Sequence, residues 1–456
     1  MSNGQTRNTF PVLKRSPLLR HHRATHVPLP GPPRKNPESA SLRPSRPPYL
    51  AALLVGLGGL FAGVTGPLLS TFVPILVRDA LGDRRSLIGA VMAIDNVLLL
   101  LLVPLAGLLS DRARAGGGRR VPIVVAGVVM AAIGMAVFPA SAALGIGGLI
   151  AAMVLLYTGI NLQRSPLHAL VADLLPSRYR SLGTASVTFQ MCVGAIVFLM
   201  LGRALGMRIA FLVAAGTVLV IAATFAWVLR EETSPAARPD EAGWQSLIAT
   251  LGAAIRGTLP GLRAVFFATL LLQLTFQTFS TWFALHATER FAVRPEDVAL
   301  GFIAWAIGGV IGALPAGALG VRFGRRTAML LGFGLMCACL LALDRVATLA
   351  QAVPLLALAS ASWTLPTVNA FPLFMEPIPH QHRGMLAAVF LLCMALGGAI
   401  GDPLNGSLFD LAGGYRPLFV LMAVYTAFAF LAVLLVPRGA GEANTGPEEN
   451  FAPRPG

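Results

Sequence analysis

Residues 107–122 read GLLSDRARAGGGRRVP and directly follow a long apolar stretch. A related segment, GALGVRFGRR, occupies residues 317–326. Both copies begin with glycine and end in Gly-Arg-Arg, although Val321 stands where the first copy has Asp111. Repetition of such a junction indicates that the chain contains two homologous halves.

A second repeated segment supports this division. The chain reads Asp173-Leu-Leu-Pro176 followed by Arg180, and later Glu376-Pro-Ile-Pro379 followed by Arg383. The acid, the proline and the arginine are each separated from their counterparts by 203 residues. Two matched halves are the arrangement found in many secondary transporters, which hold their substrate at the interface between repeats.

The composition excludes a soluble enzyme. The 456 residues are 55% hydrophobic and 12% charged, with a mean hydropathy of +0.73, whereas soluble domains carry about 25% charged residues. Four cysteines in so long a chain cannot form a disulfide framework. A length of about 20 apolar residues per span predicts twelve spans, at approximately 50–77, 87–109, 121–139, 146–172, 184–202, 209–229, 263–287, 297–318, 327–343, 352–375, 385–409 and 416–436.

We therefore predict an all-α membrane protein, with twelve transmembrane helices in two pseudo-symmetric bundles of six. The expected parts are a disordered basic cytoplasmic tail (1–48), an N-terminal bundle (49–229), a cytoplasmic linker (230–262), a C-terminal bundle (263–436) and a disordered C-terminal tail (437–456). Within the linker, apolar residues from Trp244 to Ile255 fall at helical spacing. This spacing predicts a short helix at the membrane surface.

The formal net charge of +15 is typical of nucleic-acid-binding proteins, but the charge is placed differently here. Nine basic residues lie in the tail, and most others lie at span ends on the side of the two termini. Exceptions on the opposite side include Arg78, Arg85 and Arg203. The positive-inside rule predicts a multi-pass cell-membrane protein with both termini cytoplasmic and no nucleic-acid partner. The tail is either simply solvated or in contact with anionic lipid head groups.

Segment 107–122 resembles the loop signature between the second and third helices of the major facilitator superfamily. Its adjacent Arg119 and Arg120, followed by Pro122, resemble the branch of glycoside and sucrose cation symporters. Residues 161–182, NLQRSPLHALVADLLPSRYRSL, are similar to the same branch. The resemblance covers residues 50–436. It implies a monomeric transporter that works by alternating access, without enzymatic activity or a cofactor, whose partners are the lipid bilayer, a small-molecule solute and a proton or other cation.

The resemblance also implies that charged residues at the cytoplasmic helix ends stabilise one access state. The residues expected to have this gating role are Asp111, Arg112, Arg119, Arg120, Asp173, Arg180, Glu376 and Arg383. A contact formed in only one state biases the equilibrium by its differential energy. The alternative is a set of ordinary surface ion pairs, each of which contributes little.

Polar side chains at membrane depth are costly and therefore mark functional positions. In the fourth span Tyr157, Asn161, Arg164 and His168 share one helical face at i, i+4, i+7 and i+11. An arginine at this depth offers a fork of hydrogen-bond donors to sugar hydroxyls, a carboxylate or a phosphate. We expect these residues to bind the solute. The alternative is that a neighbouring helix holds Arg164 through an acid or backbone carbonyls.

Two further groups complete the predicted solute site. Gln273 and Gln277 lie one turn apart in the seventh span, and Trp363, Thr367 and Asn369 lie in the tenth. The resemblance implies that these two helices line the central cavity. Amides and hydroxyls beside an aromatic ring suit a polyol, although such residues also serve as contacts between membrane helices.

Asp95 is the predicted coupling residue, because a deep carboxylate can carry a proton or another cation. It could equally be a permanent partner of Arg164 or a hydrogen-bond acceptor between helices. Asp402 is a weaker candidate, since Pro403 and Gly406 suggest the outer end of its helix. No metal site is expected, because Cys337 and Cys339 point to opposite sides of a helix.

These features predict a secondary active transporter of a small polar solute, a sugar or glycoside, that works by alternating access with a proton as one candidate coupling ion. Two alternatives use the same fold: an efflux transporter of hydrophobic compounds, and a non-transporting membrane sensor or scaffold. Arg164 argues against cationic cargo, because like charges repel at the binding depth. The intact Asp111 loop and the polar stripes argue against a scaffold, which would not need them.

Overall fold

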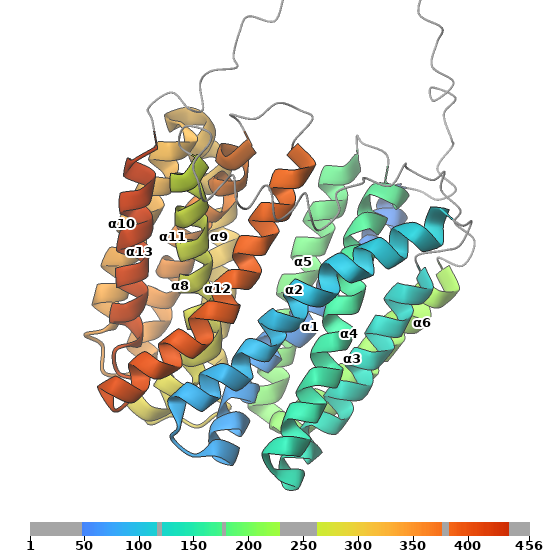
Figure 1. Ribbon diagram of the computed structural model, residues 1–456, viewed down its shortest axis with the longest axis horizontal. Coiled ribbons are helices and arrows are strands. Elements are labelled where there is room, and N and C mark those ends of the chain that lie inside the picture. The colour runs from blue at the N-terminus through green and yellow to red at the C-terminus, as the bar shows by residue number, and fades with distance from the viewer. Residues whose placement is uncertain (1–47, 116–120, 176–178, 229–261, 376–382, 437–456) are drawn as a thin grey trace, which may run out of the picture. The chain divides into compact units, whose positions relative to one another are not determined.

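The computed structural model describes residues 48–115, 121–175, 179–228, 262–375 and 383–436 (Figure 1). These residues form twelve α-helices and a 3-10 turn at Ala142–Leu144, without a strand, so the predicted all-α fold class is confirmed. The helices are α1 (Pro48–Leu81), α2 (Arg85–Ala115), α3 (Val121–Ser141), α4 (Gly145–Leu174), α5 (Arg180–Leu205), α6 (Met207–Val228), α8 (Leu262–Arg290), α9 (Ala299–Phe323), α10 (Arg325–Leu343), α11 (Leu349–Met375), α12 (Arg383–Ala412) and α13 (Leu418–Leu434).

Each of the twelve predicted spans coincides with one helix, with ends that agree to within about six residues. The helices extend beyond the predicted apolar spans because their backbone hydrogen bonding continues into the polar interface. Helix α2, for example, continues to Ala115. Eight described stretches are long and apolar enough to cross a membrane, or nine if the bent pair Ala299–Ala313 and Pro315–Phe323 counts as one span. The stretch Val121–Leu167 includes both α3 and most of α4. The predicted tails and linker lie, apart from Pro48 and Leu262, outside the described residues.

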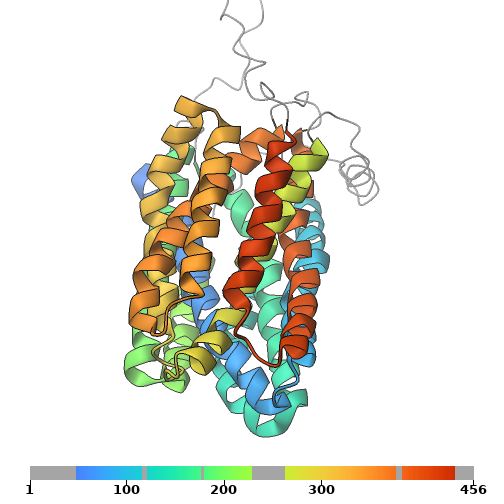
Figure 2. The same cartoon turned by 90° about the vertical axis from the view of Figure 1, so that its left-hand side faces the viewer.

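The same helix neighbours recur in the two halves of the described chain. In the first half α3 packs on α4 and α6, and in the second half α10 packs on α11 and α13. Likewise α1 packs on α5 as α8 packs on α12. Figure 1 shows the helices of each half grouped together, with α12 running obliquely beside α2, and Figure 2 shows most helices running between the same two ends of the bundle. This recurrence agrees with the internal repeat in the sequence.

The helices alternate in direction, so the bundle has two distinct ends. We call the end that contains Pro48 and Val436 the terminal end, and the end with the connections 82–84, 291–298 and 413–417 the distal end. Helices α2 and α12 belong to different halves and pack directly against each other. They diverge toward the terminal end in Figure 1.

Glycines allow the closest helix approaches. A Cβ atom at Gly59 of α1 would overlap the backbone carbonyl of Val187 on α5, and one at Gly308 of α9 would overlap that of Ala357 on α11. Both glycines belong to small-residue stripes, which are typical of membrane helix interfaces. Gly66 differs from this pattern, because nothing lies within 4 Å of the position that a Cβ atom would take there.

We expect Gly59→Ala to destabilise the fold by about 1–3 kcal/mol, because α1 and α5 must move apart. Gly66→Ala is the matched control on the same helix, and it should leave stability unchanged or slightly raised. Thermal unfolding of purified protein in detergent measures both variants. Equal unfolding midpoints would show that the α1–α5 contact is not tight.

Candidate substrate and coupling site

The first part of the site surrounds Asp95 on α2. The side-chain nitrogen of Asn161 on α4 donates to Asp95 Oδ1 at 3.2 Å and to the backbone oxygen of Tyr157 at 3.0 Å. Arg164 also interacts electrostatically with Asp95. Of the predicted residues on α4, Asn161 therefore contacts this carboxylate directly and Arg164 acts on it through its charge, because their spacing places them on one helical face. The side chain of His168 lies outside the described residues.

Asn161 and Tyr157 are packed inside the protein. Asn161 is fully buried, and its side-chain oxygen has no hydrogen-bond partner among the described residues. Tyr157 belongs to the apolar core. Arg164 is half-buried. Among the alternatives for Asp95, this geometry favours a partner of Arg164 and a hydrogen-bond acceptor between α2 and α4.

The second part of the site surrounds Asp402 on α12. Its side chain is fully buried, and Oδ2 accepts hydrogen bonds from Asn96 of α2 at 3.4 Å and from Gln277 of α8 at 3.3 Å. The amide nitrogen of Gln277 also donates to Thr281 at 3.2 Å. The other carboxylate oxygen, Oδ1, has no hydrogen-bond partner among the described residues. Since Asn96 lies in the first half and Asp402 in the second, this contact joins the halves inside the bundle.

The expectation that Asp402 lies near an outer helix end was wrong. Helix α12 continues to Ala412, and the residues after Asp402 serve packing rather than helix termination. Asn405 donates to Thr278 at 2.8 Å and accepts from the Tyr425 hydroxyl at 2.7 Å. Gly406 allows α12 to approach the backbone of Arg85. The available signal was an acidic residue well inside the predicted span 385–409.

The remaining predicted solute residues have different surroundings. Gln273 is buried beside Gly397 of α12. Trp363 stacks on Phe276 with ring centroids 5.0 Å apart, and its indole nitrogen is buried without a partner among the described residues. Thr367 donates to the backbone of Trp363 at 2.8 Å.

Asn369 is occupied by contacts between helices. Its amide nitrogen donates to the backbone oxygen of Ala316 on α9 at 3.0 Å and to that of Leu365 on its own helix at 2.9 Å. Gly320 of α9 faces the amide closely enough that a larger residue would overlap it. Both donor hydrogens of Asn369 are therefore used within the protein.

The residues predicted to gate the terminal end lie outside what the structure describes. Arg119, Arg120 and Glu376 fall between the described ranges. The backbones of the others are helical, but their side chains are likewise not described: Asp111, Arg112, Asp173, Arg180 and Arg383. Their gating role stays a prediction.

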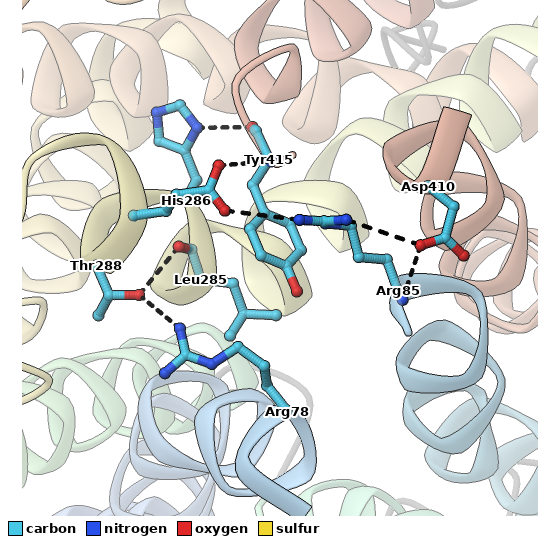
Figure 3. A network of polar contacts seen from close by, with 8 residues as sticks. Arg78, Arg85, Leu285, His286, Thr288, Asp410 and Tyr415 are labelled. Atoms are coloured by element: carbon cyan, nitrogen blue, oxygen red, sulfur yellow. Dashed lines mark hydrogen bonds and ion pairs between the residues drawn. The ribbon is translucent and has the colours of Figure 1, made fainter. Parts of the chain in front are cut away.

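A second polar network, which the sequence did not predict, joins the halves at the distal end (Figure 3). Asp410 at the end of α12 accepts hydrogen bonds from the backbone nitrogens of Arg85 and Ser86 at 3.0 and 2.8 Å. The carboxylate thus caps the N-terminus of α2, where unpaired N–H groups and the helix dipole favour negative charge. The Arg85 side chain lies 3.9 Å from Asp410 and 4.0 Å from Glu289 of α8.

Tyr415 forms the centre of this distal network. The Arg85 guanidinium lies over its ring at 5.0 Å, its backbone nitrogen donates to Glu289 at 3.0 Å, and its backbone oxygen contacts His286 Nδ1 at 2.8 Å. Burial raises the pKa of the Tyr415 phenol to about 12, so the ring stays neutral beneath the guanidinium. Figure 3 shows the ring between the helices that carry these partners.

Three further contacts join the halves toward the same end. Ser70 of α1 and Ser280 of α8 share a hydrogen bond of 2.8 Å, and Arg78 donates to Thr288 at 3.3 Å. Arg203 of α5 donates to Asp297, which precedes α9, at 3.1 Å. Among the described residues, these polar contacts between the halves thus extend from mid-membrane to the distal end. The sequence signal was the position of these charges: Arg85 and Arg203 lie at span ends in the first half, and the acids Asp410 and Asp297 lie at span ends in the second half.

The chain matches the family described as Major Facilitator Superfamily over residues 52–286 and 265–455. It is 30% identical to an uncharacterized symporter of Synechocystis sp. (strain ATCC 27184 / PCC 6803 / Kazusa) over 91 residues. That match spans 20% of this chain and 17% of the symporter.

Solved structures share the fold at low sequence identity. A bacterial homolog of the human lysosomal transporter Spinster, in an inward-facing and occupied conformation, has a TM-score of 0.69 at 14% identity, over 86% of this chain and 97% of that one. The nucleoside transporter NupG has a TM-score of 0.67 at 13% identity, over 86% and 100%. The E. coli fucose:proton symporter FucP has a TM-score of 0.56 at 16% identity, over 86% and 100%. At these identities the likeness shows the fold alone.

We expect Asp410→Ala to open the distal end more often, because α2 loses its cap and Arg85 loses an acidic partner. Loss of a cap costs about 0.5–2 kcal/mol, which corresponds to a shift of roughly twofold to thirtyfold in the equilibrium. The measurement is the rate at which a membrane-impermeant maleimide labels Ser280→Cys, in a chain whose four native cysteines are replaced by alanine.

Asp344→Ala is the matched control, because Asp344 caps the distal end of α10 without a hydrogen bond or ion pair to the first half among the described residues. Its labelling rate should equal that of the parent chain. If Asp410→Ala labels no faster than Asp344→Ala, the distal network does not hold the halves together.

The Arg203–Asp297 contact should weaken in acid. The hydrogen bond from Arg294, reinforced by that from Arg203, lowers the pKa of Asp297 below its ordinary value of about 3.9. A carboxylate with a lowered folded-state pKa contributes stability above its unfolded pKa and loses it as the pH falls through the folded value. The contribution is at most about 1 kcal/mol, because the group is near the surface. Thermal unfolding should show native protein more stable than Asp297→Asn at neutral pH, with a difference that begins to shrink below the ordinary Asp pKa and vanishes as the pH falls through the lowered pKa of Asp297. A pH-independent difference would contradict this.

Proposed function

Because the chain belongs to the major facilitator superfamily, we propose that it moves a small polar solute of the sugar or glycoside class across the cell membrane, in symport with protons. The family and fold make it a multi-pass membrane transporter rather than an enzyme. The family supports secondary transport of small molecules in general. The solute class and the coupling ion are what we propose for this chain. Alternating access supplies the mechanism, with the two six-helix halves rocking about the solute.

The observation that carries this proposal is the mid-membrane polar layer formed by Asp95, Asn161, Arg164, Asp402 and Gln277. It draws on helices from both halves and contains amide and carboxylate groups at a depth where each is costly. A solute with many hydroxyl groups can donate to the Asp95 carboxylate and to the unpartnered side-chain oxygen of Asn161, and it can accept from the Arg164 guanidinium. A hydrophobic cargo would leave the same groups unpaired, which disfavours the efflux alternative.

Aromatic rings beside the layer support a sugar or glycoside. Trp363 stacks on Phe276, and Trp305 lies 6.1 Å from Trp363 and 4.1 Å from Phe279, measured between ring centroids. The faces of such rings pack against the apolar side of a sugar ring. The unpartnered indole nitrogen of Trp363 offers a donor to a hydroxyl or ring oxygen of the solute.

The contacts between the halves support alternating access. With both termini placed in the cytoplasm, the distal end faces outward, and the network of Arg85, Asp410 and Tyr415 closes that side. The described contacts then correspond to a state that admits solute from the cytoplasmic side. Opening outward requires these ion pairs and the Asn96–Asp402 hydrogen bond to break, so solute and coupling ion must offset their loss.

The test is counterflow and uptake by the full chain in proteoliposomes, over a panel of monosaccharides, disaccharides and aryl glycosides, with and without an imposed pH gradient. We expect Trp363→Ala to weaken the apparent affinity for the transported solute about tenfold, through lost stacking, and Trp363→Phe to retain most of it. Trp227→Ala is the matched control, because that indole is 82% exposed on α6.

Three outcomes would contradict the proposal. Movement of hydrophobic dyes but no sugar would favour the efflux alternative, and movement of no compound would favour a sensor or scaffold. Equal solute affinities in the Trp363→Ala and Trp227→Ala variants would remove the aromatic rings from the solute site.

A further inference from the structure

We propose that Asp402, rather than Asp95, binds the proton that couples transport to the proton gradient. This inference rests on the proposed function, because it names the residue that carries the coupling ion. It follows from how the two deep carboxylates are neutralised. One has a cationic partner and the other does not.

The negative charge of Asp95 is already compensated. Arg164 interacts with it electrostatically, and Asn161 donates a hydrogen bond to Oδ1. Protonation of Asp95 would remove the negative charge that acts on the half-buried guanidinium of Arg164, which is costly inside a membrane. With a cation acting on it and a hydrogen bond from Asn161, Asp95 has the role of orienting the solute-binding face of α4.

Asp402 has no cationic partner among the described residues. The groups that reach it from α8 are Gln277, Thr281 and Trp282, all uncharged. From the first half, Asn96 of α2 donates a hydrogen bond, and the charge that acts on it is the negative one of Asp95.

Among the described residues, no cation of the other neighbouring elements acts on Asp402. Helix α11 contains no charged residue, and Tyr157 of α4 is neutral. His286 of α8 is directed to the backbone of Tyr415 at the distal end. Counted as fully ionised, the layer of Asp95, Arg164 and Asp402 has one negative charge in excess, and a single proton on Asp402 removes it.

The geometry leaves one position for that proton. Oδ2 accepts from Asn96 and Gln277, whereas Oδ1 is buried with no partner among the described residues. A hydronium ion transfers its proton to Oδ1: one O–H bond of hydronium breaks, one O–H bond to Oδ1 forms, and a water molecule is released. The hydroxyl oxygen of Thr281 can then accept the new O–H, because a hydroxyl offers two acceptor lone pairs.

Protonation at this position acts on the contact between the halves. The bond from Asn96 to an ionised carboxylate is charge-assisted, and such bonds are roughly twice as strong as neutral ones. Gly89 of α2 lies against the backbone oxygen of Asp402, so the two halves touch closely here. Proton binding weakens this contact and favours separation of α2 from α12, which opens the distal end. Proton release restores the state described here.

The transport test compares Asp402→Asn with Asp95→Asn and with a control, Asp83→Asn, whose side chain is exposed at the distal end. We expect Asp402→Asn to keep counterflow within about twofold of the native rate but to lose accumulation driven by a pH gradient, so that solute only equilibrates. Asp95→Asn should lose both activities, because Arg164 loses its partner. Asp83→Asn should behave as the native chain. Accumulation by Asp402→Asn at the native level would overturn the proposal, while its counterflow would still support transport.

A second measurement needs no solute. Infrared difference spectra of the reconstituted full chain between alkaline and acid pH should show the C=O band of a newly protonated carboxylic acid. This band should be present in native protein, Asp95→Asn and Asp83→Asn, and absent in Asp402→Asn. If Asp402→Asn does not fold, Asp402→Ser takes its place. A band that persists without Asp402 overturns the proposal. If the band behaves as expected but no sugar moves, the proposed solute class fails and the proton site stands.

Discussion

A charge placed in the middle of a membrane must be compensated by another charge, by hydrogen bonds or by a proton, because the surrounding hydrocarbon offers nothing else. This constraint explains the polar layer. Asp95 has a hydrogen bond from Asn161 and the charge of Arg164 acting on it, whereas the described groups that reach Asp402, among them the amides of Asn96 and Gln277, are all uncharged. Because the charge of Asp95 is compensated, we assign it to orienting the solute. Because the charge of Asp402 is not, we assign it to binding the proton.

Helices α2 and α12 connect this layer to the distal network. Asp402 and Asp410 both lie on α12, and their partners Asn96 and Arg85 both lie on α2. A change at mid-membrane that separates the two helices also strains the cap at the distal end, since helices are rigid over two turns. The same helix pair can therefore sense the proton and control access. Alternating access requires such a contact between rigid helices, whose strength depends on whether the proton is bound.

Patterns between residues close together in the chain predicted much of this structure from the sequence. Apolar length placed the twelve helices, because a membrane helix must satisfy its own backbone and span a fixed thickness. Helical periodicity placed Tyr157, Asn161 and Arg164 on one face. The repeated junctions indicated two halves, and the same helix neighbours recur in them. Each of these inferences depends on residues within about one helix of each other.

The sequence by itself therefore determined the helices, their faces and the family, whereas the tertiary structure decided which polar groups meet. Asp402 was undervalued because Asn96 and Gln277, far away in the chain, are what make it a buried site. Asn369 was grouped with solute-binding residues, yet a backbone carbonyl of α9 takes its amide. The distal network escaped notice because Asp410 caps a helix in the other half. A partner's identity depends on helix packing, and no local pattern encodes it.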